Sequence, residues 1–73
     1  MITFEEARIK AQSRKVLIDT VKIYESAYVF SYSKDISLAE MNDVVVLKNS
    51  GDIYFKHQVQ EKDLGDLIKI QEL

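Results

Sequence analysis

The residue types that could perform catalysis are few in this chain, which has one histidine and no cysteine. His57 alternates with Phe55 and Val59, a pattern more typical of a histidine at the rim of a sheet face than of a general base. Residues 61–66 are rich in acids, but they lack the ligand order of a calcium loop and include Lys62. We therefore expect no enzyme, no catalytic residue and no metal site.

Glycine-rich phosphate-binding motifs are also missing from the sequence. Gly51 and Gly65 are the two glycines of the chain, whereas a dinucleotide fingerprint or a P-loop needs several glycines at fixed spacing. The sequence excludes nucleotide binding by those routes, and we expect no cofactor.

A basic cluster lies near the N-terminus and contains Arg8, Lys10, Arg14 and Lys15. Such a cluster is typical of the solvated face of a helix, and the alternative is a surface that binds nucleic acid or another anionic ligand. The net charge of −2 is too small to indicate a nucleic-acid partner. These four residues, together with Tyr54 on the expected sheet, are our candidate binding residues.

Tyr28, Phe30 and Tyr32 alternate along one expected strand. Aromatic rows of this kind form stacking platforms in proteins that bind single-stranded nucleic acid, where basic residues accompany them. No lysine or arginine lies between Tyr28 and Tyr32, so the row is more typical of a core face that a helix covers. An apolar row with polar rims could also dock a partner.

The N-terminal segment predicts a helix over residues 4–15. Thr3 and Glu6 have the spacing of a capping box, in which the Thr3 hydroxyl accepts from the Glu6 amide and the Glu6 carboxylate accepts from the Thr3 amide. At 100° per residue, one apolar stripe about 60° wide suits packing on a sheet. That stripe consists of Phe4, Ala7, Ala11 and Ile18.

Alternation with period two predicts strands at residues 19–24 and 27–33, with the aromatic face of the second strand buried. Two further β-rich runs, residues 44–47 and 53–59, flank Asn49, Ser50 and Gly51, which suit a tight turn. Residues 34–43 have a mixed pattern that indicates a loop, with a single helical turn possible at 37–40.

The C-terminal tail has two interpretations. Asp63 could cap a helix in which Leu64, Leu67 and Ile68 share a face, yet residues 68–71 alternate like a strand. We favour the helix slightly. The chain, residues 1–73, is then one α+β domain with an N-terminal helix packed on a four-stranded, mainly antiparallel sheet.

Three short motifs occur in order along the chain. They are a T-x-E-E-A helix start at residues 3–7, an aromatic strand at residues 28–33 and a V-x-x-x-x-x-G-x-I/V hairpin at residues 45–54. In this order the chain resembles the YrhB-type family of small bacterial immunity-like proteins. The resemblance implies a cystatin-like α+β fold that acts by binding, either neutralising a toxin or holding a client protein, and it brings no catalytic residues.

The lack of catalytic groups and the resemblance together predict a small non-enzymatic protein-binding module, immunity-like or chaperone-like. The alternative is the nucleic-acid or anionic-ligand binder described above. Residues 1–6 put acid where a secretory signal peptide has base, and no apolar run approaches the ~18 residues of a membrane span. We therefore expect a cytoplasmic protein with no membrane partner.

Sheet edges in a domain this small favour pairing with a second copy. The candidate edges for such a homodimer are the strand with Val21 and Ile23 and the strand over residues 54–59. Lys22 and Lys56 are charges that could instead keep those edges monomeric.

Overall fold

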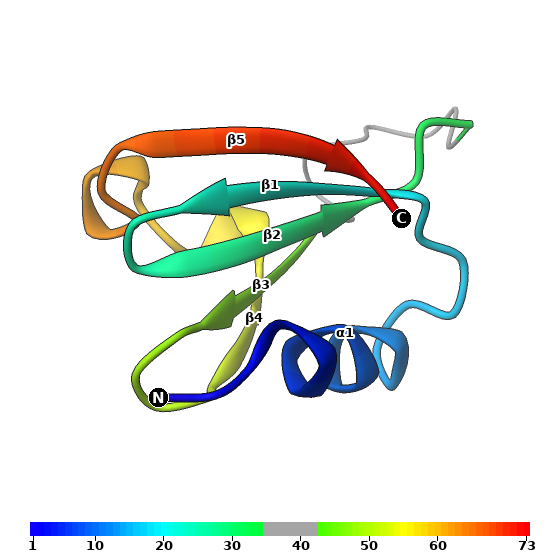
Figure 1. Ribbon diagram of the computed structural model, residues 1–73, viewed down its shortest axis with the longest axis horizontal. Coiled ribbons are helices and arrows are strands. Elements are labelled where there is room, and N and C mark those ends of the chain that lie inside the picture. The colour runs from blue at the N-terminus through cyan, green and yellow to red at the C-terminus, as the bar shows by residue number, and fades with distance from the viewer. Residues whose placement is uncertain (35–42) are drawn as a thin grey trace.

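The computed structural model describes residues 1–34 and 43–73, which form one helix and one five-stranded antiparallel sheet (Figure 1). The expected loop at 34–43, with its possible helical turn, lies almost entirely outside these residues. The elements are α1 (Phe4–Gln12), β1 (Thr20–Tyr24), β2 (Ala27–Ser31), β3 (Val44–Leu47), β4 (Ile53–Phe55) and β5 (Leu67–Glu72), with short 3₁₀ helices η1 (Lys56–Gln58) and η2 (Glu61–Asp63). The α+β class is confirmed.

The strands follow the order β4-β3-β2-β1-β5. The first four in sequence form a meander, and the last returns across the sheet to pair with β1. Figure 1 shows α1 on the part of the sheet away from β5, consistent with its contacts to β2 and β3. The two margins of the sheet are therefore β4 and β5.

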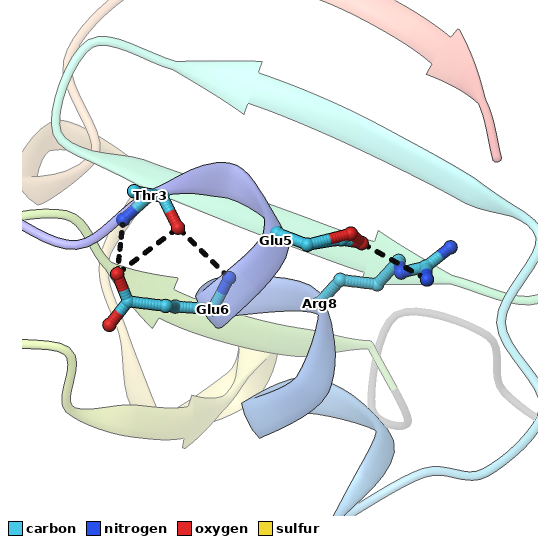
Figure 2. Close-up of polar contacts among 4 residues, drawn as sticks. All are labelled: Thr3, Glu5, Glu6 and Arg8. Carbon is cyan, nitrogen blue, oxygen red and sulfur yellow. Dashed lines mark hydrogen bonds and ion pairs between the residues drawn. The ribbon is translucent and has the colours of Figure 1, made fainter.

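The expected capping box begins α1. The Thr3 hydroxyl accepts a hydrogen bond from the Glu6 amide at 3.2 Å, and the Thr3 amide donates to the Glu6 carboxylate at 3.3 Å (Figure 2). The helix ends at Gln12 rather than Lys15. Ser13 donates its hydroxyl proton to the Lys10 carbonyl at 2.5 Å, a side-chain bond that competes with continued helix. No helix in the described residues is long and apolar enough to span a membrane.

The face of the sheet beneath α1 carries the larger core cluster. Phe30 is fully buried there, and Phe4 packs edge-on against Tyr28 with ring centroids 5.4 Å apart. The prediction that the aromatic face is buried is confirmed for Phe30 and in part for Tyr28, which is half-buried, whereas β2 ends at Ser31, before Tyr32. The buried members of this helix-side cluster are Ala7, Ala11, Val21, Phe30, Val44 and Val46.

The opposite face of the sheet is also covered. The alternation of polar and apolar residues along the strands does not indicate this second core. Leu64, which lies between η2 and β5 in the sequence, is fully buried. Its side chain packs on this face of the sheet. Val45, which simple alternation would leave in water, is 0% exposed for this reason. The buried members of this second cluster are Ala27, Val29, Val45 and Leu64.

The fourth strand is shorter than its predicted span of residues 53–59. After Phe55 the chain turns into η1. The Lys56 amide bonds to the Asp43 carbonyl, so the neighbouring Phe55 amide points to the outer margin of β4. There it donates to the Gln58 side chain at 2.9 Å, a local bond that occupies this edge donor. Val59 then packs against the second cluster.

The preference for a C-terminal helix is wrong, and so is the count of four strands. Residues 67–72 form β5, which pairs with β1 in the register Val21↔Gln71, with a bulge between Ile23 and Tyr24. This pairing satisfies the backbone hydrogen-bonding groups along one edge of β1. Such a tertiary contact outweighs the weak local preference of residues 67–72 for helix. The strand with Val21 and Ile23 is therefore not an edge, which corrects one of the two expected dimer edges.

We predict that Leu64→Ala destabilises the protein by about 2–5 kcal/mol, because it removes buried methyl groups and leaves a cavity in the second cluster. The free energy of unfolding from urea denaturation measures this. Leu17→Ala is the matched control, since the Leu17 side chain is 62% exposed, and it should change the free energy by less than about 0.5 kcal/mol. Equal losses for the two variants would contradict the assignment of Leu64 to a core.

Candidate protein-binding surface

The structure separates the four basic candidate residues. Arg8 lies on α1 and forms an ion pair with Glu5, with a nitrogen–oxygen distance of 3.0 Å (Figure 2). The stem of Lys10 packs over Gly51, where a Cβ atom would lie 3.4 Å from the Lys10 Cε. Arg14 and Lys15 follow the end of the helix. The basic face expected of one helix thus contains two of the four residues.

Tyr54 lies on the face of β4 opposite α1, because it pairs with Val45 of the second cluster. It borders an open depression of about 350 Å³ lined by Leu47, Tyr54, Gln58, Val59 and Asp63. A smaller cavity of about 80 Å³ adjoins it, and Arg14 forms part of its wall. Tyr54 and Arg14 are therefore the pair of candidate residues that the structure brings to one region.

His57 lies in η1, beyond the end of β4, and not on a strand as its alternation with Phe55 and Val59 predicted. His57 is exposed, and its ring is parallel to that of Phe55 with centroids 6.2 Å apart. Within the described ranges, no group of three or more His, Cys, Asp or Glu side chains could hold a metal ion.

Several exposed apolar residues lie along β5, a strand that sequence reasoning did not select. All six of its residues are exposed, and Ile68 and Ile70 are 63% and 58% exposed. Leu67 and Leu73 at its ends are also exposed. The alternation of residues 68–71 was the signal that could have identified this strand.

The two faces of β5 differ in chemistry. Lys69 and Gln71 pair with Ile23 and Val21, so they lie on the face that carries α1. Ile70 pairs with Lys22 and lies on the opposite face. An added strand would meet a polar row on one side and an apolar row on the other.

One margin of β5 is hydrogen-bonded to β1, and no strand among residues 1–34 and 43–73 pairs with the other. Its amides and carbonyls on that margin can accept an extended segment. Unlike β4, which has three residues, β5 is long enough for several such bonds. We define the outer margin of Leu67–Glu72 as the β5 edge.

Asp19 fixes the end of β1 next to β5. Its carboxylate accepts hydrogen bonds from the Ser33 hydroxyl at 2.5 Å and from the Ser33 amide at 2.8 Å. Its carbonyl also accepts from the Leu73 amide at 2.9 Å. The side-chain bond from Ser33 is the main cause that lowers the pKa of Asp19 below its ordinary value of 3.8, with smaller contributions from the Ser33 amide and the Thr20 hydroxyl.

No protein-family model matches the chain, and comparison with curated proteins and with solved structures gave no match. The YrhB-type resemblance and the cystatin-like fold that it implies remain predictions.

We predict that Asp19→Asn makes the stability of the fold less sensitive to acid. Because the folded pKa of Asp19 is lowered, its contribution is fully present above the unfolded pKa and is lost as pH falls through the folded pKa. The wild type should therefore lose more stability than the variant as pH falls from about 5 to below 3. Thermal unfolding midpoints across this range measure the difference.

The matched control for this prediction is Asp52→Asn, in the β3–β4 turn. Asp52 lies far from Ser33 in the sequence, and its amide donates to the Ser50 hydroxyl at 3.2 Å. This variant should retain the acid-dependent loss due to Asp19. An acid-dependent loss in Asp19→Asn as large as in wild type would contradict the role of this carboxylate.

Proposed function

We propose that this chain is a small non-enzymatic protein-binding module that pairs the β5 edge with an extended segment of a protein chain. The observation that supports the proposal is that all six residues of β5 are exposed, Ile68 and Ile70 among them. Exposed edges of this length and apolarity usually carry charges, bends or a covering element. The β5 edge carries Lys69 and Glu72 and has a bulge opposite Ile23 and Tyr24. No strand among the described residues covers its outer margin, so this margin is a template for another strand.

Strand addition fits the chemistry of the β5 edge. Backbone hydrogen bonds supply affinity without side-chain specificity, and alternate side chains of the added segment select which face it presents. A suitable segment is amphipathic, with apolar residues on the side of Ile70 and polar residues on the side of Lys69. The mechanism needs no catalytic group.

The YrhB-type resemblance extends this proposal to a cytoplasmic immunity-like or chaperone-like role, in which the bound protein is a toxin or a client. Binding of nucleic acid or an anionic ligand through Arg8, Lys10, Arg14 and Lys15 stays the alternative prediction. A steep loss of affinity with added salt is its signature, because counterions are released on binding. An apolar edge interaction changes little with salt.

We predict that Ile70→Pro abolishes partner binding while the protein stays folded. Proline removes the amide donor of Ile70 from the edge, and edge strands tolerate proline where the amide faces solvent. The experiment captures proteins from the source cell extract on immobilised wild type and variant. Hydrogen exchange of the captured complex then shows whether the β5 amides are protected.

Two further variants control this experiment. Ile9→Ser removes an equally exposed isoleucine, 62% exposed on α1, and it should bind like the wild type. Tyr54→Ser tests the β4 margin and its depression, and it should also bind like the wild type. A captured protein that binds Ile70→Pro as well as the wild type, or that protects β4 instead of β5, would refute the proposed function.

A further inference from the structure

We infer that the segment received by the β5 edge is β5 of a second copy of this chain, paired antiparallel about a two-fold axis at Ile70. This inference rests on the proposed function, because it names the partner of the same edge. The result is a homodimer with one continuous sheet across both copies.

A hydrogen bond at the C-terminal end of β5 shows which of its groups point outward between Lys69 and Leu73. The Leu73 amide donates to the Asp19 carbonyl, so the backbone of Leu73 faces β1. Facing and outward residues alternate in an antiparallel pair. Gln71 and Lys69 therefore bond to β1, while the amides and carbonyls of Ile70 and Glu72 point away from the sheet.

The β5 strand of a second copy must place its own outward-facing residues opposite these groups. Pairing of Ile70 with Ile70 of the second copy does so, and the two residues then exchange both backbone hydrogen bonds. The same register places Glu72 opposite Ile68 on either side of the axis. Regular pairing extends no further than Ile68, because β5 is bulged between Lys69 and Leu67.

Charge disfavours two of the other possible registers. An axis at Lys69 would place two lysines directly opposite each other, and like charges in those positions are destabilising. An axis at Glu72 would oppose two carboxylates. With the axis at Ile70, Lys69 lies opposite Gln71, and no like charges within residues 68–72 are directly opposed.

The apolar side chains complement the same arrangement. The two Ile70 side chains meet on the face opposite α1, where Lys22 of each copy lies beside its own Ile70. The lysine stems can cover the isoleucines while the ammonium groups remain in water. A single-strand contact buries less than the ~800 Å² per partner of a standard interface, so we expect a dissociation constant in the micromolar range.

Single-cysteine cross-linking tests both the dimer and its register, because the natural chain has no cysteine. The Cα atoms of a hydrogen-bonded pair are about 5.5 Å apart, within the range of a disulfide. We predict that Ile70→Cys forms a disulfide-linked dimer in air at micromolar concentration. Non-reducing electrophoresis measures the yield.

Two control variants test whether the cross-link reports the Ile70 register. In the Ile70 register the two copies of residue 69 are offset by two positions, about 8 Å apart, which exceeds disulfide reach. Lys69→Cys should therefore cross-link at least about tenfold more slowly than Ile70→Cys. Ile9→Cys reports chance collisions of an exposed site on α1. Faster cross-linking of Lys69→Cys, or an equal rate for Ile9→Cys, would overturn the inferred pairing.

Sedimentation equilibrium of the unmodified chain provides a test that does not depend on a thiol. The wild type should show a monomer–dimer equilibrium, and Ile70→Lys should weaken it by about tenfold or more, since it places two lysines at the axis. Amide exchange at Ile70 and Glu72 should slow with rising protein concentration. An 8.5 kDa species up to high micromolar concentration would overturn the dimer.

Failure of the dimer and failure of the proposed function give different results. A monomeric wild type that captures another protein, with loss of capture in Ile70→Pro, would reject the second copy and retain the β5 edge as a binding site. A monomeric wild type whose captured proteins ignore Ile70→Pro would reject both.

Discussion

The contact between the β1–β2 turn and residues 64–66 is the constraint on which the second half of this fold depends. The Ser26 amide donates to the Leu64 carbonyl at 2.9 Å, and the Glu25 amide donates to the Asp66 carbonyl at 3.0 Å. The Glu25 carboxylate accepts from the Asp66 amide at 2.8 Å. Gly65 lies between these bonds with φ of 79°, and a Cβ there would lie 2.9 Å from the Glu25 Cβ. Only glycine fits both the space and the backbone.

This contact has consequences on two sides of the sheet. It seats Leu64 over the face away from α1, where full burial of such a side chain contributes about 1.5–3 kcal/mol. It also aims the chain along β1, so that β5 begins in register for antiparallel pairing. A domain of 73 residues gains little from one core alone. The second cluster adds burial without a second helix.

Sequence reasoning succeeded where the determining contacts are local. Thr3 and Glu6 are three residues apart, and Gly51 adopts the positive φ, 74°, that its turn needs. It failed where distant contacts decide. Leu64 has a similar local pattern in a helix or a buried turn, and its burial depends on Val29 and Val45, far away in sequence. The same holds for β5. Its alternating pattern identifies a strand only once β1 is known to have an unpaired edge.

The same distinction between local and distant contacts applies to the candidate site residues. The spacing of Arg8 and Lys10 on α1 follows from a local helix, but the helix end at Gln12 leaves Arg14 and Lys15 beyond it. Tyr54 was expected on a sheet surface, which its position on β4 agrees with. Ile70 could not be chosen from the sequence, because an isoleucine in an edge strand and one in a helix face differ only through tertiary pairing.

The two margins of the sheet end in different ways, and the difference argues for selectivity at β5. At β4 the strand stops after three residues. The Gln58 side chain accepts a hydrogen bond from the Phe55 amide, and the Lys56 amide donates to the Asp43 carbonyl. At β5 the strand runs for six residues, with Lys69 in its middle on the side of α1. Because the charge lies on one face and Ile70 on the other, a strand shifted by one residue would turn its apolar side chains toward Lys69. A strand that paired with the β5 edge would therefore be selected by register and not by backbone bonding alone.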